Sequence, residues 1–288
     1  MVQRPTVLAA VPTPFDENGD VDLFAAKRRF AALSGVVDGL FVGGTVGEFP
    51  ALDAHERTDL AVMALSVADR SSVIIHTGAP SARQAVELTR VAARRGATRF
   101  AAVTPYYFTA PLSRIVEYYQ AIREVSGKGD VYAYLDPERT GADLNPDDLA
   151  WIVARAGLTG AVLAGGAALR FGDFQAAAPS GTQLFSCDDA ALPEVAAGGG
   201  AGLVSGVASV FPDPYRRLAD AVGAGDAGTV AELGGRVREL AKVVGSSVAR
   251  LKMTQSVFGW SLADVRVPVA PVDAETINRI GKLIAEFG

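Results

Sequence analysis

Cysteine and histidine are scarce in this sequence, which contains only Cys187, His55 and His76. A single cysteine excludes a disulfide framework within the chain and fits a reducing compartment. One cysteine and two histidines, without a recognisable spacing, are too few for a typical zinc site. We therefore expect no resident metal, and no motif indicates another cofactor.

Long apolar runs are also missing, and none approaches the roughly 20 residues that a membrane-spanning helix needs. The first residues contain prolines and acidic side chains where a signal peptide has an uninterrupted apolar core. The formal net charge is −5, and the basic residues form no stripe that would attract nucleic acid or an anionic membrane. These absences predict a cytoplasmic protein that binds neither nucleic acid nor membrane.

The apolar residues, 49% of the 288, lie mostly in short runs separated by helical patterns. Eight runs are almost continuously apolar, which is typical of strands in a buried parallel sheet. These predicted strands are Thr6–Val11, Gly39–Val42, Val73–His76, Arg99–Val103, Val131–Leu135, Gly160–Leu163, Gln183–Ser186 and Gly202–Ser205.

Helix start signals stand between these strands. Asp53 and Glu56 have the spacing of a capping box, and so do Ser81 and Gln84. Asn145 precedes a proline, the residue favoured at the first position of a helix. The alternation of strands and helices predicts an α/β fold with parallel strands.

Eight such units with right-handed connections predict a closed (β/α)8 TIM barrel. An open doubly wound sheet is the alternative, but it often has a glycine-rich phosphate loop where this chain has Pro12–Phe15. We expect the barrel in residues 1–224. Residues 225–288 are expected to be a C-terminal extension packed on it in one structural domain, with helices at about 227–243, 247–258 and 273–286.

Several polar residues stand at the C-terminal ends of the predicted strands, where barrel enzymes carry their chemistry. Thr45 lies in a glycine-rich segment whose amides and hydroxyl can bind a carboxylate, although a tight turn explains the same pattern. Tyr107 and Tyr134 offer phenols that can relay a proton, although tyrosines here often serve packing. Arg139 can bind a carboxylate or pair with a neighbouring acid on the surface.

His76 and Cys187 also stand at strand ends. His76 is a candidate base, although a lone histidine more often has a structural role. The Cys187 thiol has no basic neighbour in sequence that would activate it. The adjacent Asp188 is expected to cap the next helix.

Taken together, the motifs resemble the dihydrodipicolinate synthase / N-acetylneuraminate lyase family of pyruvate-dependent class I aldolases over essentially the whole chain. The resemblance rests on Val11–Phe15, Asp38–Leu40 with Gly44–Glu48, Val103–Tyr107, Tyr134–Gly141, Ser186–Ala190, Gly202–Ser205, and Lys252 with Arg266–Pro268. It implies the same barrel and a small 2-oxo acid as substrate. It also implies a homodimer or homotetramer.

The resemblance assigns roles to individual residues. A hydroxyl relay in the family corresponds to Thr45, Tyr107 and Tyr134, with Tyr107 lent across a dimer interface. Arg139 matches an arginine that binds a substrate carboxylate, and the remaining substrate-binding positions match Val46, Val162 and Val204.

The family's imine-forming lysine, however, is missing. Strand six carries Val162 at that position and Leu163 at that of the acid beside it, and no lysine stands between Lys128 and Lys242. Valine cannot condense with a carbonyl group. Three hypotheses follow: an enzyme with altered, non-imine lyase chemistry, a non-catalytic ligand-binding or regulatory pseudoenzyme, and an ordinary pyruvate aldolase with a relocated lysine.

Overall fold

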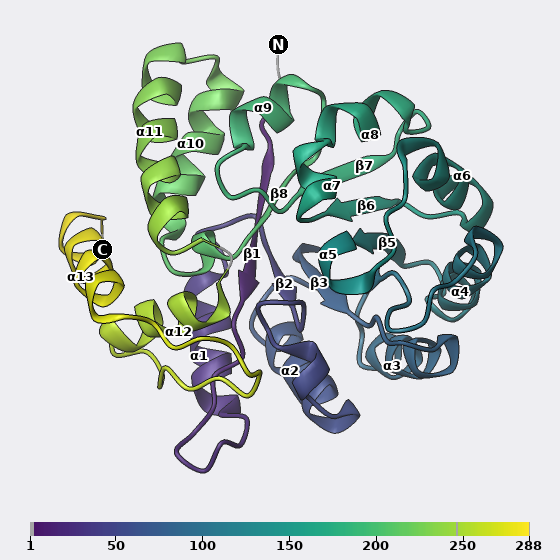
Figure 1. The fold of residues 1–288 in the computed structure, drawn as a ribbon, viewed down its shortest axis with the longest axis horizontal. Coiled ribbons are helices and arrows are strands. Elements are labelled where there is room, and N and C mark those ends of the chain that lie inside the picture. The colour runs from purple at the N-terminus through teal and green to yellow at the C-terminus, as the bar shows by residue number, and fades with distance from the viewer. Residues whose placement is uncertain (1–2, 246, 288) are drawn as a thin grey trace.

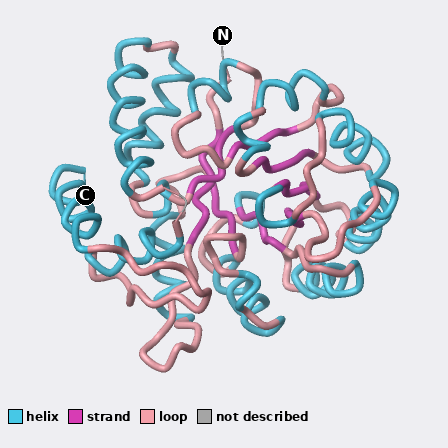
Figure 2. Tube along the Cα trace, in the orientation of Figure 1, coloured by secondary structure: helices cyan, strands magenta, loops and turns pink. Residues whose placement is uncertain are grey.

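The computed structural model describes residues 3–245 and 247–287. Eight parallel strands form a closed barrel in sequence order, with β1 hydrogen-bonded to both β2 and β8. The strands gather at the centre of the molecule and the helices surround them (Figure 2). The predicted (β/α)8 barrel is therefore confirmed.

The strands follow the short apolar runs of the sequence. Almost every strand residue is buried, because one face fills the barrel interior and the other lies under the helices. Only β5 differs from the prediction, because it begins one residue earlier, at Asp130. The strands are β1 Thr6–Val11, β2 Gly39–Val42, β3 Val73–His76, β4 Arg99–Val103, β5 Asp130–Leu135, β6 Gly160–Leu163, β7 Gln183–Ser186 and β8 Gly202–Ser205.

Helices begin where the sequence places capping side chains. The Asp53 carboxylate accepts from the amides of His55 and Glu56, and Asn145 caps its helix by accepting from the Asp148 amide. The helices are α1 Leu23–Leu33, α2 Ala54–Leu65, α3 Ala82–Arg94, α4 Leu112–Val125, α5 Pro137–Thr140, α6 Pro146–Ala156, α7 Gly166–Leu169, α8 Phe171–Ala177, α9 Leu192–Ala197, α10 Pro212–Ala224, α11 Ala227–Val243, α12 Val248–Val257 and α13 Ala274–Phe287, with 3-10 turns η1 Phe49–Ala51, η2 Arg70–Ser72 and η3 Val207–Ser209.

The last three helices cover one side of the barrel. Helix α11 lies beside α10, and α13 packs against α11 and α12 (Figure 1). Ion pairs join this extension to the barrel: Arg266 contacts Glu56 at 2.7 Å, and Lys252 contacts Glu48 at 2.5 Å. Within the described residues, no helix combines the length and apolarity required to cross a bilayer.

Candidate functional site

A cavity of about 110 Å³ opens at the C-terminal ends of the strands, and we call it the mouth pocket. Strands β1, β2, β5 and β8 and the segments after β2, β5, β6 and β7 contribute to its walls. Its apolar side chains include Ala10, Phe41, Val46, Ala164 and Val204, and its polar side chains are Thr45, Tyr134, Asp136, Arg139, Cys187 and Asp189. The pocket thus lies where barrel enzymes carry their chemistry.

Tyr134 lies at the centre of the polar wall. Its hydroxyl is 2.8 Å from the Thr45 hydroxyl and donates a longer bond, 3.4 Å, to Asp136. The edge of its ring meets the ring of Phe41. Burial, with Cys187 and Asp136 nearby, raises the pKa of Tyr134 well above its ordinary value. The phenol therefore stays protonated and is available as a hydrogen-bond donor.

Arg139 and Asp136 form an ion pair at the rim of the pocket. One guanidinium nitrogen of Arg139 lies 3.0 and 3.1 Å from the two carboxylate oxygens of Asp136. Asp136 is buried, whereas the Arg139 side chain is 54% exposed. Burial is the main cause that raises the pKa of Asp136. The surface-pair interpretation of Arg139 is thus correct in part, but its remaining donors stay available for a carboxylate.

Asp189 is a second buried carboxyl group on the pocket wall. Its Oδ1 atom accepts from the Ser205 hydroxyl at 2.5 Å and from the Val207 amide at 3.4 Å. Burial raises the pKa of Asp189 to about 6. Asp189 lies in the motif Ser186–Ala190, from which no role for it is predicted. Its position directly after a strand was the available signal.

The turn after β7 departs from the predictions in another way. Asp188 does not cap the next helix, because its carboxylate accepts from the Ala190 amide within the turn and helix α9 begins after Ala191. The Cys187 thiol lines the mouth pocket, and burial raises its pKa. A thiol that stays protonated is a poor nucleophile.

His76 does not line the mouth pocket. Its ring is buried between Phe49 and Tyr134, and its Nε2 atom accepts from the Val103 amide at 3.2 Å. Arg57 lies 3.2 Å from its other ring nitrogen. Burial and the Arg57 charge hold the pKa of His76 well below its ordinary value. This placement favours the structural alternative over the predicted role as a base.

Tyr107 also lies away from the pocket of its own chain. The residue is 87% exposed, and its ring lies edge-on to the exposed ring of Phe108. Its backbone has a φ of +77°, a conformation that non-glycine residues rarely adopt. The single chain thus brings Thr45 and Tyr134 together and leaves Tyr107 out.

Strand β6 presents no amine to the pocket. Val162 is fully buried and paired in register with Tyr134 on β5 and Phe185 on β7. Val162 is not part of the pocket lining, whereas Thr45, Val46, Arg139 and Val204 are. The predicted substrate-binding positions therefore line one cavity, except for Val162, which is buried within the barrel.

Lys252, on α12, is buried but is not part of the mouth pocket. Its ammonium group lies 2.5 Å from the Glu48 carboxylate, donates to the Asp264 carbonyl at 2.7 Å and sits over the Phe15 ring. Burial lowers the pKa of Lys252 to about 8. Through these contacts the Lys252 amine links the C-terminal extension to Glu48 of the barrel.

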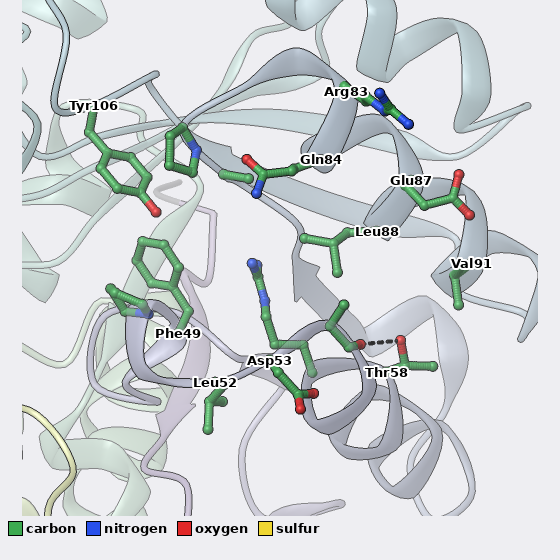
Figure 3. Close-up of a pocket in the computed structure, with 15 residues that line it drawn as sticks. Phe49, Leu52, Asp53, Thr58, Arg83, Gln84, Glu87, Leu88, Val91 and Tyr106 are labelled. Carbon is green, nitrogen blue, oxygen red and sulfur yellow. Dashed lines mark hydrogen bonds between the residues drawn. The ribbon is translucent and has the colours of Figure 1, made fainter.

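A larger groove, about 590 Å³, lies on the outer helical layer between α2 and α3 (Figure 3). The labelled side chains mix apolar residues such as Leu88 and Val91 with Arg83, Gln84 and Glu87. Tyr106 and Phe49 stand at its end nearest the barrel. The groove contains neither Tyr134 nor Arg139, so we locate the candidate chemistry in the mouth pocket.

Comparisons with known proteins agree with this geometry. The sequence matches the Dihydrodipicolinate synthetase family over residues 4–287. A relative from Streptomyces coelicolor, described as 4-hydroxy-tetrahydrodipicolinate synthase 1, is 30% identical over 294 aligned positions that cover 98% of this chain and 94% of the relative.

Two solved structures share the fold. A catalytic lysine mutant of Ruminococcus gnavus sialic acid aldolase has a TM-score of 0.89 at 21% identity and covers 98% of this chain and 96% of its own. YagE, a prophage protein of E. coli K12 belonging to the dihydrodipicolinic acid synthase family and solved with pyruvate, has a TM-score of 0.89 at 24% identity and covers 98% of both chains. This chain therefore belongs to the dihydrodipicolinate synthetase family.

Proposed function

We propose that this chain binds a small 2-oxo or 2-hydroxy acid in the mouth pocket and acts on it by proton transfer, without forming an imine. The observation that carries the proposal is the assembly of Tyr134, Thr45, Asp136 and Arg139 around one cavity while β6 presents Val162. The similar proteins support the proposal. One is described as a 4-hydroxy-tetrahydrodipicolinate synthase, one was solved in complex with pyruvate, and one is a sialic acid aldolase with a catalytic lysine.

The proposed chemistry uses groups with different proton affinities. Arg139 holds the carboxylate of the substrate through the donors that Asp136 leaves free. Tyr134, which stays protonated, donates to the carbonyl oxygen, and Thr45 supports it. Asp189, with a pKa of about 6, is ionised at neutral pH and takes a proton from C3 of a bound 2-oxo acid, next to its carbonyl. The negative charge moves to the carbonyl oxygen, which the Tyr134 hydroxyl stabilises.

Imine formation is not part of this proposal, because no described lysine lines the mouth pocket. Lys252 has the lowered pKa that an imine-forming amine needs, but its bonds to Glu48 and the Asp264 carbonyl hold it in the extension. A relocated lysine therefore has no support in the geometry of this chain.

The test is hydrogen exchange at the methyl group of pyruvate in D2O, followed by NMR. We expect protein-dependent exchange that is reduced at least tenfold in Tyr134→Phe and Asp189→Asn. Asp188→Asn, which removes an acid outside the mouth pocket in the same turn, is the control and should exchange normally. A covalent pyruvate adduct after borohydride reduction, seen by mass spectrometry, would contradict the proposal.

A non-catalytic role is the second candidate. Val162 and Leu163 are both fully buried, so β6 packs as core where the family resemblance implies a lysine and an acid. A protein of this kind would be stabilised against heat by pyruvate without promoting exchange. Exchange at ordinary enzymatic rates would exclude it.

A further inference from the structure

A second cavity, which we call the outer chamber, adjoins the mouth pocket. It has a volume of about 550 Å³ and shares Thr45, Val46, Asp136 and Arg139 with the pocket. Arg139 lines both cavities, so a ligand whose carboxylate binds Arg139 can extend into the mouth pocket and into the outer chamber. The lining of the chamber decides which substituents such a ligand can carry.

The walls of the outer chamber are mainly apolar. Four parts of the chain supply them: the segment after β2, the end of β4 with the segment after it, the segment after β5, and the start of α12 with the segment that follows that helix. Their apolar side chains include Val46, Phe49, Val103, Val248, Val267 and Val269. A water-exposed surface of this kind favours apolar ligand atoms, which leave water on binding.

Two hydroxyl groups of these walls already have partners, whereas the Tyr106 phenol and the Arg139 guanidinium also line the chamber. The Thr140 hydroxyl donates to the Asp136 carbonyl at 2.9 Å, and the Ser247 hydroxyl caps helix α12. Against the valine side of the chamber, a polyhydroxylated tail would exchange its bonds to water for contacts with apolar side chains, and its hydroxyls would remain unpaired there.

The valine wall is held in place by polar contacts behind it. The Glu48 carboxylate accepts from the amides of Arg266 and Val267 at 2.8 and 3.0 Å, and Arg266 pairs with Glu56. Lys252 binds the Asp264 carbonyl in the same segment. A chamber anchored in this way needs little rearrangement to receive a ligand, which lowers the entropic cost of binding.

We infer that the ligand is a 2-oxo or 2-hydroxy acid with an apolar alkyl or aryl substituent, whose carboxylate lies at Arg139 and whose substituent fills the outer chamber. This inference rests on the proposed function, because it takes the acid-binding role of the mouth pocket as given. The further inference specifies the chemical class of the substituent on the acid, which the mouth pocket alone does not specify.

The experiment measures the dissociation constants of pyruvate, 2-oxobutanoate, 2-oxopentanoate and 2-oxohexanoate by calorimetry, with 2-oxoglutarate as a charged comparison. We expect each methylene to tighten binding about fourfold until the chamber is filled. 2-Oxoglutarate should bind more weakly than 2-oxopentanoate, which has the same chain length. A flat or reversed series with pyruvate still bound would overturn the inference and leave the proposed function standing.

Two valines provide a matched pair of variants. Val269 lines the chamber and Val257 does not, yet both side chains belong to residues that are 44% exposed. Val269→Asp should weaken 2-oxohexanoate binding about tenfold more than it weakens pyruvate binding, whereas Val257→Asp should change neither. Equal effects of the two variants would contradict the assignment of the chamber. Absence of binding for every acid would overturn the proposed function together with this inference.

Discussion

The buried carboxyl group of Asp189 should make the stability of this protein depend on pH. Asp189 is 6% exposed, and burial raises its pKa from an ordinary 3.8 to about 6 despite the bond from Ser205. The folded protein therefore holds this proton more tightly than the unfolded chain does. The contribution of protonated Asp189 to the free energy of unfolding is fully present below about pH 4 and is lost as the pH rises through about 6.

The size of the effect follows from the two pKa values. The gap between 3.8 and about 6 corresponds to about 3 kcal/mol of destabilisation above pH 7. Asp189→Asn cannot ionise, and its side-chain oxygen can still accept from Ser205 and Val207. We therefore expect the variant to gain about 3 kcal/mol over the parent protein between pH 4 and pH 8. That gain corresponds to roughly 5–10 °C in the thermal midpoint.

The assay is thermal unfolding of both proteins in buffers from pH 4 to pH 8. Because all other titrating groups are common to the two proteins, the difference between their midpoints isolates the contribution of Asp189. Asp188→Asn again serves as the control for removing one negative charge from this turn. A difference that stays constant with pH, or a variant that is less stable at pH 8, would refute the reasoning.

Three further predictions concern groups outside the polar wall. Val162→Lys should form a borohydride-trapped imine with pyruvate and lose about 2–4 kcal/mol of stability, because a buried valine is replaced by a larger amine. Unfolding midpoints and intact mass check it, and a folded variant that binds pyruvate without an adduct would argue against it. Lys252→Met should cost about 3–5 kcal/mol by leaving Glu48 buried without its partner. The double variant with Glu48→Gln should recover part of that loss in denaturant unfolding, and no recovery would contradict the pairing argument. Tyr107→Ala should weaken a homodimer or homotetramer in light scattering, because the ring is largely exposed in the single chain and the family resemblance places it at a dimer interface; an oligomer with unchanged dissociation would exclude it from the interface.

The secondary structure and the barrel were predictable from local patterns. Seven of the eight strands begin and end at the predicted residues, because a strand buried on both faces is a short apolar run between turn signals. Asp53 and Asn145 begin their helices as expected, because a capping side chain acts on amides two or three residues away. The positions of Tyr134, Thr45 and Arg139 near one cavity followed from strand ends that meet at the same face.

Other features depended on contacts between distant segments. His76 stands at a strand end like the pocket residues, but the Val103 amide from β4 and Arg57 from α2 enclose its ring. Asp189 carries no sequence signal beyond its place after β7, and its raised pKa comes from the side chains that bury it. Lys252 joins the extension to the barrel because the fold places its ammonium group beside the Glu48 carboxylate.

The sequence by itself determined the elements, the barrel, and the absence of an amine on strand six, because these depend on residue type and on spacing along the chain. The tertiary structure decided which polar side chains face the mouth pocket, which are enclosed, and that a valine-lined chamber adjoins it. Closure of the barrel and packing of the extension bring residues together across more than 200 positions, and burial then sets their pKa values. Neither distance nor burial is encoded in a local pattern.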